Sequence, residues 1–174
     1  MPSWVGIPLT MEVGEGWREI NEEEALLFML GKGRNSFGDP TQVLVFIAVP
    51  DGSPQAILTS IRNSPEVMAV SEMTEFTIAG FSGLQVDVSA KPNPGYEGDK
   101  EAEIPAGAQF LPSVNRYFTP GFLWTTWTAE SHLRFMVLNV GEHTLLIEIE
   151  SPPAEFEAFA SEADQVLQTL KLRR

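Results

Sequence analysis

The sequence predicts an α+β fold in which helices pack on a mainly antiparallel β-sheet. Three features of the last third of the chain carry this prediction. Residues 133–138 and 145–150 alternate with period two, a glycine lies between them, and an amphipathic helical pattern follows. Period-two alternation is typical of strands, whereas apolar spacings of three and four are typical of a helix that buries one face. With 174 residues, we expect a single domain over 1–174 with a substantial core.

The first third of the chain is expected to supply strands and one helix. Residues 9–13 alternate and predict a short strand, and residues 41–49 form a longer apolar run. Residues 21–31 carry both the capping signals of a helix and a six-residue apolar run that suits a buried strand. We favour the strand, because the run at 41–49 needs a neighbour in the sheet. Residues 53–63 begin with serine and proline and predict a short helix.

Two further strands are expected at 76–79 and 84–88, with a turn at Gly80 between them. The run from Gly80 to Gly83 contains Ser82 and superficially resembles a nucleophile turn. It is one residue shorter than the Gly-x-Ser-x-Gly pattern, and a strand rather than a helix follows it. We therefore assign no catalytic serine, and no other catalytic residue is assigned anywhere in the chain.

Residues 91–121 form a long irregular loop with five prolines and four glycines. Loops of this length in compact domains are usually functional or disordered. Prolines lower the entropy lost on binding, and large aromatic side chains and arginine are enriched at interface hot spots. We therefore predict a recognition surface formed by Tyr96, Arg116, Tyr117 and Phe118. The alternative is that the apolar side chains of this loop only pin an inert segment to the sheet.

The chain is then expected to form a strand at 122–128 and the hairpin described above. We expect a three-residue hairpin loop that ends at Gly141, because glycine adopts a positive φ at little cost. This loop length would place the odd-numbered apolar residues of both strands on one face, and Glu148 and Glu150 on the other. A slip of one residue would instead bring Phe135 opposite Glu148.

The last element is an acidic amphipathic helix. The segment Ser151-Pro152-Pro153 is expected to end the sheet and to supply the first turn of the helix, where proline is tolerated. Acids lie early and bases lie at the end, which complements the helix dipole. One apolar stripe follows at helical spacing: Phe156, Phe159, Ala160, Ala163, Val166, Leu167 and Leu170.

Composition excludes several classes of function. The net charge of −13, from 24 acids against 11 bases, argues against nucleic acid as a partner, because phosphate binding needs clustered Lys and Arg. No segment approaches the roughly 18 apolar residues that span a bilayer, so we expect no membrane insertion by this segment. Cysteine is absent, which removes disulfides, thiolate catalysis and cysteine-based metal sites.

No metal or cofactor site is expected either. A site at the two histidines would require His132 and His143 to converge with Glu148 or Glu150, and only His132 is expected near these acids. The acids of 97–103 lack the spacing of a calcium-binding loop. Asp87 lies in a predicted strand and would act as a base only inside a pocket.

The order of these elements resembles a group of uncharacterised extracytoplasmic bacterial domains. The resemblance lies in the early strand running into Val13–Trp17, in residues 76–88, and in the final hairpin and helix with its Leu167–Leu170 ending. The arrangement also resembles the PsbP-like α/β/α sandwich of photosystem extrinsic proteins and mycobacterial lipoproteins. Such domains usually follow a signal or a membrane anchor, and the fold hosts non-enzymatic binding and assembly proteins.

These observations predict a non-enzymatic binding or assembly module outside the cytoplasmic membrane, with an unknown protein or small ligand as its partner. The abrupt start at Met1 suits a chain that has lost an N-terminal leader or membrane tether, although a cytoplasmic protein is the open alternative. The alternative function is a small-molecule enzyme, such as a hydrolase, with a site beneath residues 91–121. The sequence leaves the oligomeric state open.

Overall fold

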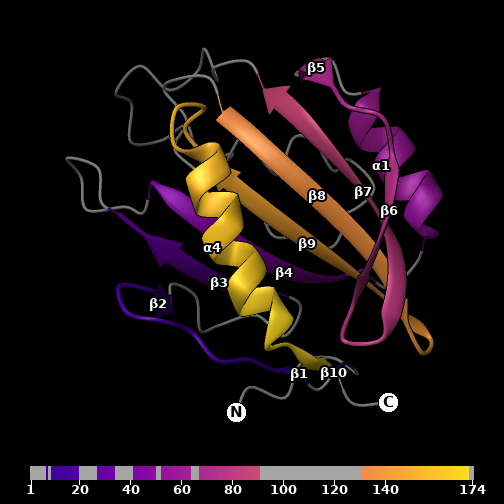
Figure 1. Ribbon diagram of the computed structural model, residues 1–174. Coiled ribbons are helices and arrows are strands. Elements are labelled where there is room, and N and C mark those ends of the chain that lie inside the picture. Colours follow the sequence, from indigo (N-terminus) through magenta and orange to yellow (C-terminus); the bar gives the residue numbers. More distant parts are fainter. Residues whose placement is uncertain are drawn as a thin grey trace, which may run out of the picture.

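The described residues form an antiparallel sheet with a helix on each face (Figure 1). The structure is a computed structural model, and it describes residue 7 and residues 9–19, 27–33, 41–49, 52–63, 67–90 and 131–172. Eight of the described strands form one sheet in the order β2-β3-β4-β9-β8-β7-β5, with β6 also paired to β7. All of its strand pairs are antiparallel.

The elements of the described sheet and helices have the following bounds. The strands of the large sheet are β2 (Arg18–Glu19), β3 (Leu27–Lys32), β4 (Gln42–Val49), β5 (Val67–Val70), β6 (Thr74–Ile78), β7 (Phe81–Ala90), β8 (Ser131–Val140) and β9 (His143–Ser151). Two short strands, β1 (Leu9–Thr10) and β10 (Lys171–Leu172), pair separately. The helices are α1 (Pro54–Arg62) and α4 (Phe156–Gln168).

The two helices cover opposite faces of this sheet, and each face has its own apolar core. On one face, Ile57, Leu58 and Ile61 of α1 pack with buried residues of β4, β7 and β8. On the other, the stripe of α4 packs on the alternate residues of the same central strands, and Figure 1 shows α4 crossing the near face of the sheet. The predicted α+β class, with a mainly antiparallel sheet and packed helices, is confirmed, and the layers form an α/β/α sandwich.

The register of the β8–β9 hairpin differs from the sequence-based prediction. Val140 pairs with His143, so the turn contains only Gly141 and Glu142, and Gly141 has a φ of +64°. A positive φ at the first central position alone is the pattern of a type II′ turn, whose twist suits a two-residue hairpin. The predicted three-residue loop is therefore wrong. The two strands pair in the register that is shifted by one residue from the predicted one, and Phe135 lies opposite Glu148.

The turn between β6 and β7 explains the glycines that superficially resembled a catalytic motif. Ala79 and Gly80 both have positive φ, as a type I′ hairpin turn requires. At Gly83 in β7, a Cβ atom would lie 2.4 Å from the carbonyl oxygen of Val137 and 2.7 Å from the ring of Phe76. The absence of a side chain at Gly83 is therefore a packing requirement of β6, β7 and β8.

Most of the predicted elements within the described residues are present. The preference for a strand near 21–31 is confirmed for β3, whereas 21–26 lie outside the described residues. Helix α1 begins as predicted, because the Oγ atom of Ser53 accepts a hydrogen bond of 3.2 Å from the Ala56 backbone N–H. The strand predicted at 122–128 and the loop 91–121 lie outside the described residues.

Helix α4 follows the predicted stripe, with one correction at its start. Ser151 is the last residue of β9, and the N-cap is Glu155, so both prolines precede the helix instead of occupying its first turn. The apolar stripe from Phe156 to Leu167 is buried, as predicted. This helix therefore contributes most of the apolar cover on its face of the described sheet.

Residues 9–19 contact helix α4 and the residues that follow it. β1 pairs with β10, and the Glu12 backbone N–H donates a 2.8 Å hydrogen bond to the Oγ1 atom of Thr169. The Trp17 ring lies 5.3 Å from the ring of Phe159. Lys32 of β3 forms an ion pair with Glu162 of α4. These contacts join both ends of the described chain to the same face of the sheet.

Candidate functional site

A pair of buried carboxyl groups lies in the central strand β9. Glu148 is 2% exposed and Glu150 is 0% exposed, although both are acids in a chain with a large negative charge. Residues two apart in a strand point to the same face, so the two carboxyl groups are neighbours. Buried acids are rare unless they are paired or protonated, which makes this pair the most unusual chemical feature of the described residues.

The register places the pair in apolar surroundings on the face that α1 covers. Glu148 lies between Val45 of β4 and Phe135 of β8, and Glu150 lies between Val43 and Leu133. Residues directly opposite one another share a face, and all four of these neighbours belong to the core on the α1 side. The two acids thus replace apolar residues in the middle of a hydrophobic layer.

This environment changes the acidity of Glu148. Burial raises the pKa of Glu148 from 4.5 to about 7, and the hydrogen bond with Glu150 lowers it by a smaller amount. Desolvation disfavours the charged form of a carboxyl group, whereas a hydrogen bond to that form favours it. The Oε2 atom of Glu148 has no hydrogen-bond partner among the described residues. The pair therefore holds a proton in the core at mildly acidic pH.

The sequence contains a signal for this pair that pattern analysis missed. β9 carries buried apolar residues on both of its faces. Leu146 lies on one face, and Leu145, Ile147 and Ile149 lie on the other. A strand with a solvated face would instead show polar residues along that face. The near-continuous apolar run indicates a strand covered on both sides, so any acid within it must be buried.

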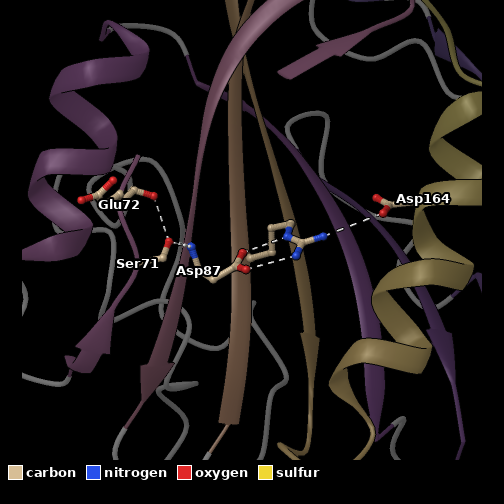
Figure 2. A network of polar contacts seen from close by, with 5 residues as sticks. Ser71, Glu72, Asp87 and Asp164 are labelled. Carbon is tan, nitrogen blue, oxygen red and sulfur yellow. Dashed lines mark hydrogen bonds and ion pairs between the residues drawn. The ribbon is translucent and has the colours of Figure 1, made fainter. Parts of the chain in front are cut away.

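The opposite face of the sheet carries a network of charged groups around Arg134 of β8 (Figure 2). The Nε and Nη2 atoms of Arg134 donate hydrogen bonds of 2.8 Å and 3.1 Å to the two carboxylate oxygens of Asp87 in β7. The Nη1 atom lies 3.8 Å from the Oδ2 atom of Asp164 in α4. The guanidinium group also lies over the Phe156 ring, 5.7 Å from its centroid. Arg134 thus ties helix α4 to two strands.

The electrostatics of this network are those of a structural ion pair. The hydrogen bond with Asp87 raises the pKa of Arg134 above its ordinary value, and burial opposes the rise. Burial raises the pKa of Asp164, while the charge of Arg134 lowers it. Both carboxylate oxygens of Asp87 accept bonds from the guanidinium group, so this geometry does not support Asp87 as a general base.

A small open hollow lies beside Asp87 at the edge of the sheet. It has a volume of about 220 Å³ and is lined by Ser71, Glu72, Thr74, Gln85, Val86 and Asp87. Ser71 closes one side, because its Oγ atom accepts a 2.9 Å hydrogen bond from the Asp87 backbone N–H and donates one of 3.0 Å to the Glu72 carbonyl (Figure 2). Five of its six lining residues are polar or charged, whereas small-molecule sites are lined predominantly by hydrophobic and aromatic side chains.

The histidines do not join the buried acids. His132 lies opposite Ser151, and its ring packs 5.2 Å from that of Phe156 on the α4 face. Glu148 and Glu150 lie on the α1 face, so the expectation that His132 lies near them was wrong. Among the described residues, no group of three or more potential ligands could hold a metal ion.

The predicted recognition residues Tyr96, Arg116, Tyr117 and Phe118 lie outside the described residues. The strands on either side of this segment are described. β7 ends at Ala90, β8 begins at Ser131, and these two residues pair with each other. Residues 91–130 therefore connect two neighbouring antiparallel strands, a connection that a turn of two residues can make.

Comparison with known proteins gives similarity at the level of fold. No protein-family model and no curated protein sequence matches the chain. LpqN of Mycobacterium tuberculosis, which is involved in cell envelope biogenesis, is similar with a TM-score of 0.60 and 13% identity, over 97% of this chain and 85% of LpqN. This similarity confirms the expected α/β/α sandwich fold.

Two other solved structures align over most of the chain. A protein from Bacteroides thetaiotaomicron VPI-5482 has a TM-score of 0.53 and 11% identity over 95% of this chain, which spans 45% of that protein. PsbP of the cyanobacterium Synechocystis sp. PCC 6803 has a TM-score of 0.48 and 9% identity, over 95% of this chain and 92% of PsbP. Within the described residues, no helix is long and apolar enough to cross a bilayer.

Proposed function

We propose that this chain is a non-enzymatic, extracytoplasmic binding or assembly module whose recognition surface is formed by Tyr96, Arg116, Tyr117 and Phe118. The observation that carries the proposal is the pairing of Ala90 with Ser131. Two strands that are already neighbours need only a short turn, yet the chain places 91–130 between them. Functional segments are commonly inserted in this way into loops held by a rigid scaffold.

The scaffold beneath this segment suits a binding role. β8 is a long central strand whose alternate residues are buried in the two cores, and Val86 and Val88 of β7 are buried in the core on the α1 side. A segment fixed at both ends to such strands starts from a defined position, which lowers the entropy lost on binding. The proposed partner is a protein or a small ligand rather than nucleic acid, because the net charge is −13.

The proposed location outside the cytoplasmic membrane rests on the similarity to LpqN, which is involved in cell envelope biogenesis. The proposal includes attachment through an N-terminal leader or tether upstream of Met1. It also treats residues 1–174 as a single domain. Immunogold labelling or protease accessibility of the full-length gene product in intact cells tests the location directly.

Shortening the loop tests the recognition surface. We would replace residues 95–108 by a short Gly/Ser linker and change Tyr117 and Phe118 to Ser. The fold is expected to survive, because the entropy of loop closure depends only weakly on length. A partner isolated with the wild-type chain from an envelope extract should bind this variant at least about tenfold more weakly, corresponding to about 1.4 kcal/mol. Biolayer interferometry measures the two affinities.

Val13→Ser serves as the matched control, since Val13 is an exposed apolar residue far from this segment in the sequence. It should leave the affinity unchanged, and the urea midpoint should confirm that both variants fold. Full affinity in the shortened and substituted variant would rule out Tyr117 and Phe118 and the replaced segment as the binding surface.

A second candidate function is favoured by the buried acids. Two neighbouring buried carboxyl groups, one with a pKa near neutrality, are residues that general acid–base catalysis can use. If the chain is a small-molecule hydrolase with a site beneath 91–121, Glu148 and Glu150 are its best candidates for acid and base. The apolar neighbours of the pair would keep water out of such a site.

A substrate panel separates the two candidates. Chromogenic esters, phosphoesters and glycosides would be incubated with the wild-type chain and with Glu148→Gln/Glu150→Gln. The proposed binding function predicts no turnover above background with either protein. Turnover by the wild type that disappears in the double variant would favour the hydrolase and contradict the binding module.

A further inference from the structure

The outer edge of the sheet beside β7 carries an exposed apolar strand. β5 ends the strand order, and β7 is its pairing partner among the described strands. Its four residues, Val67–Val70, are all apolar. Met68 is 44% exposed and Val70 is 39% exposed, and the other large apolar side chain exposed among the described residues is Val13. Figure 1 shows β5 at the rim of the sheet, next to α1.

An edge strand offers unpaired backbone donors and acceptors along its outer side, to which an extended segment can add as a new strand. The register of β5 shifts between Val67 and Ala69, which leaves Met68 as an extra residue. Such a bulge bends the strand and redirects a side chain, and the side chain concerned is exposed. Among the described strands, none pairs with the outer side of β5, so this edge combines backbone groups without a described strand partner with two accessible apolar side chains.

Acidic side chains border this strand. Glu72 follows β5 and Glu75 lies in β6, the other strand that flanks β7 on this side; both are exposed. Residues 67–78 contain no Lys or Arg. A second copy of the chain would bring these acids together, and like charges on neighbouring strands are destabilising. The charge pattern thus disfavours self-association at this edge and favours a basic partner.

We propose that the β5 edge binds an extended basic peptide segment, with alternate apolar residues and flanking Lys or Arg, which adds to the sheet as a further strand. This inference rests on the proposed function as a binding module and identifies the chemistry of one partner. Main-chain hydrogen bonds supply affinity, Met68 and Val70 supply apolar contact, and Glu72 and Glu75 select the positive flanks.

A pair of labelled peptides tests the proposal. The probe is fluorescein-labelled Lys-Lys-Val-Thr-Val-Thr-Val-Lys-Lys, and its counterpart carries Glu at the four flanking positions. Fluorescence anisotropy with the full chain at low ionic strength should give at least about tenfold tighter binding of the basic peptide. The variant Met68→Lys/Val70→Lys should weaken that binding by at least about tenfold.

The control variant is Val13→Lys/Gln165→Lys, which adds the same charge at two exposed positions away from the edge. It should retain most of the affinity, and the peptide should shift the backbone amide NMR signals of 67–70. The proposal would be overturned if the chain bound both peptides equally or bound neither. It would also be overturned if the edge variant and the control variant lost affinity for the basic peptide to the same extent.

Concentration-dependent dimers in sedimentation experiments, abolished by Met68→Lys/Val70→Lys, would assign the edge to a second copy and also overturn it. The failure of this inference is distinguishable from that of the proposed function. A partner that needs 95–118 but is indifferent to the β5 variant, with no peptide binding, would overturn only the edge proposal. Peptide binding at β5 that survives loop shortening would support it independently of the loop.

Discussion

Replacing Leu167 by Asp is expected to lower the free energy of unfolding by more than about 3 kcal/mol. Leu167 is 2% exposed and belongs to the core between α4 and the sheet. The substitution removes apolar contacts and places a charged side chain in an apolar core, and both effects are strongly destabilising. Urea-induced unfolding followed by circular dichroism measures the change.

The matched control is Gln165→Asp, which adds the same charge two residues earlier on the exposed side of the same helix. Surface substitutions of this kind usually change stability by less than about 0.5 kcal/mol. Equal unfolding midpoints for the two variants would contradict the placement of the apolar stripe against the sheet.

The second large effect is expected from Glu148→Gln, and it depends on pH. Burial raises the pKa of Glu148 from 4.5 to about 7, so between these values the folded chain keeps a proton that the unfolded chain releases. The folded state then binds more protons, and stability falls as pH rises through this interval. The corresponding loss is about 3 kcal/mol by pH 8. Gln has the same shape and no charge.

The Gln variant should therefore match the wild type near pH 4.5 and exceed its stability at pH 8, by up to about 3 kcal/mol. Comparing variant and wild type at each pH cancels the titration of the many other acids. Glu142→Gln, at the exposed hairpin turn, is the control and should leave the profile close to that of the wild type. A Glu148→Gln variant that is less stable than the wild type at pH 8 would show that the charged carboxylate has a stabilising partner.

The sequence predicted the layers of the fold better than the registers between strands. The stripe of α4 and the Ser53 cap of α1 each depend on local spacing, and both are confirmed. The hairpin register depends on the length of one turn, because a change of one residue exchanges the faces of a whole strand. β9 has buried apolar residues on both of its faces, so either register of the hairpin would bury apolar side chains. The alternation of apolar residues therefore could not distinguish the two registers.

The buried acids escaped sequence analysis for the same reason. Glu148 and Glu150 alternate with Ile147 and Ile149, which is the pattern of a strand with one solvated face. A sheet covered by a helix on each side has no solvated face in its centre. The arrangement of α1 and α4 places both acids in a core, as the near-continuous apolar run of β9 indicates.

The ion network at Arg134 was also missed, because its members are far apart in the sequence. Asp87 and Arg134 become neighbours through the β7–β8 pairing, and Asp164 joins them only when α4 packs on the sheet. The single-domain assignment of 1–174 and the recognition role of Tyr96, Arg116, Tyr117 and Phe118 stay predictions.

The most direct test of this account is a ¹³C NMR titration of the Glu148 side-chain carboxyl carbon, assigned by comparison with Glu148→Gln. The central claim is that Glu148 is buried in the core between the sheet and α1. We expect a titration midpoint near pH 7, well above the ordinary value of 4.5. A midpoint near the ordinary value of 4.5 would show that Glu148 faces solvent and would contradict its burial on the α1 side.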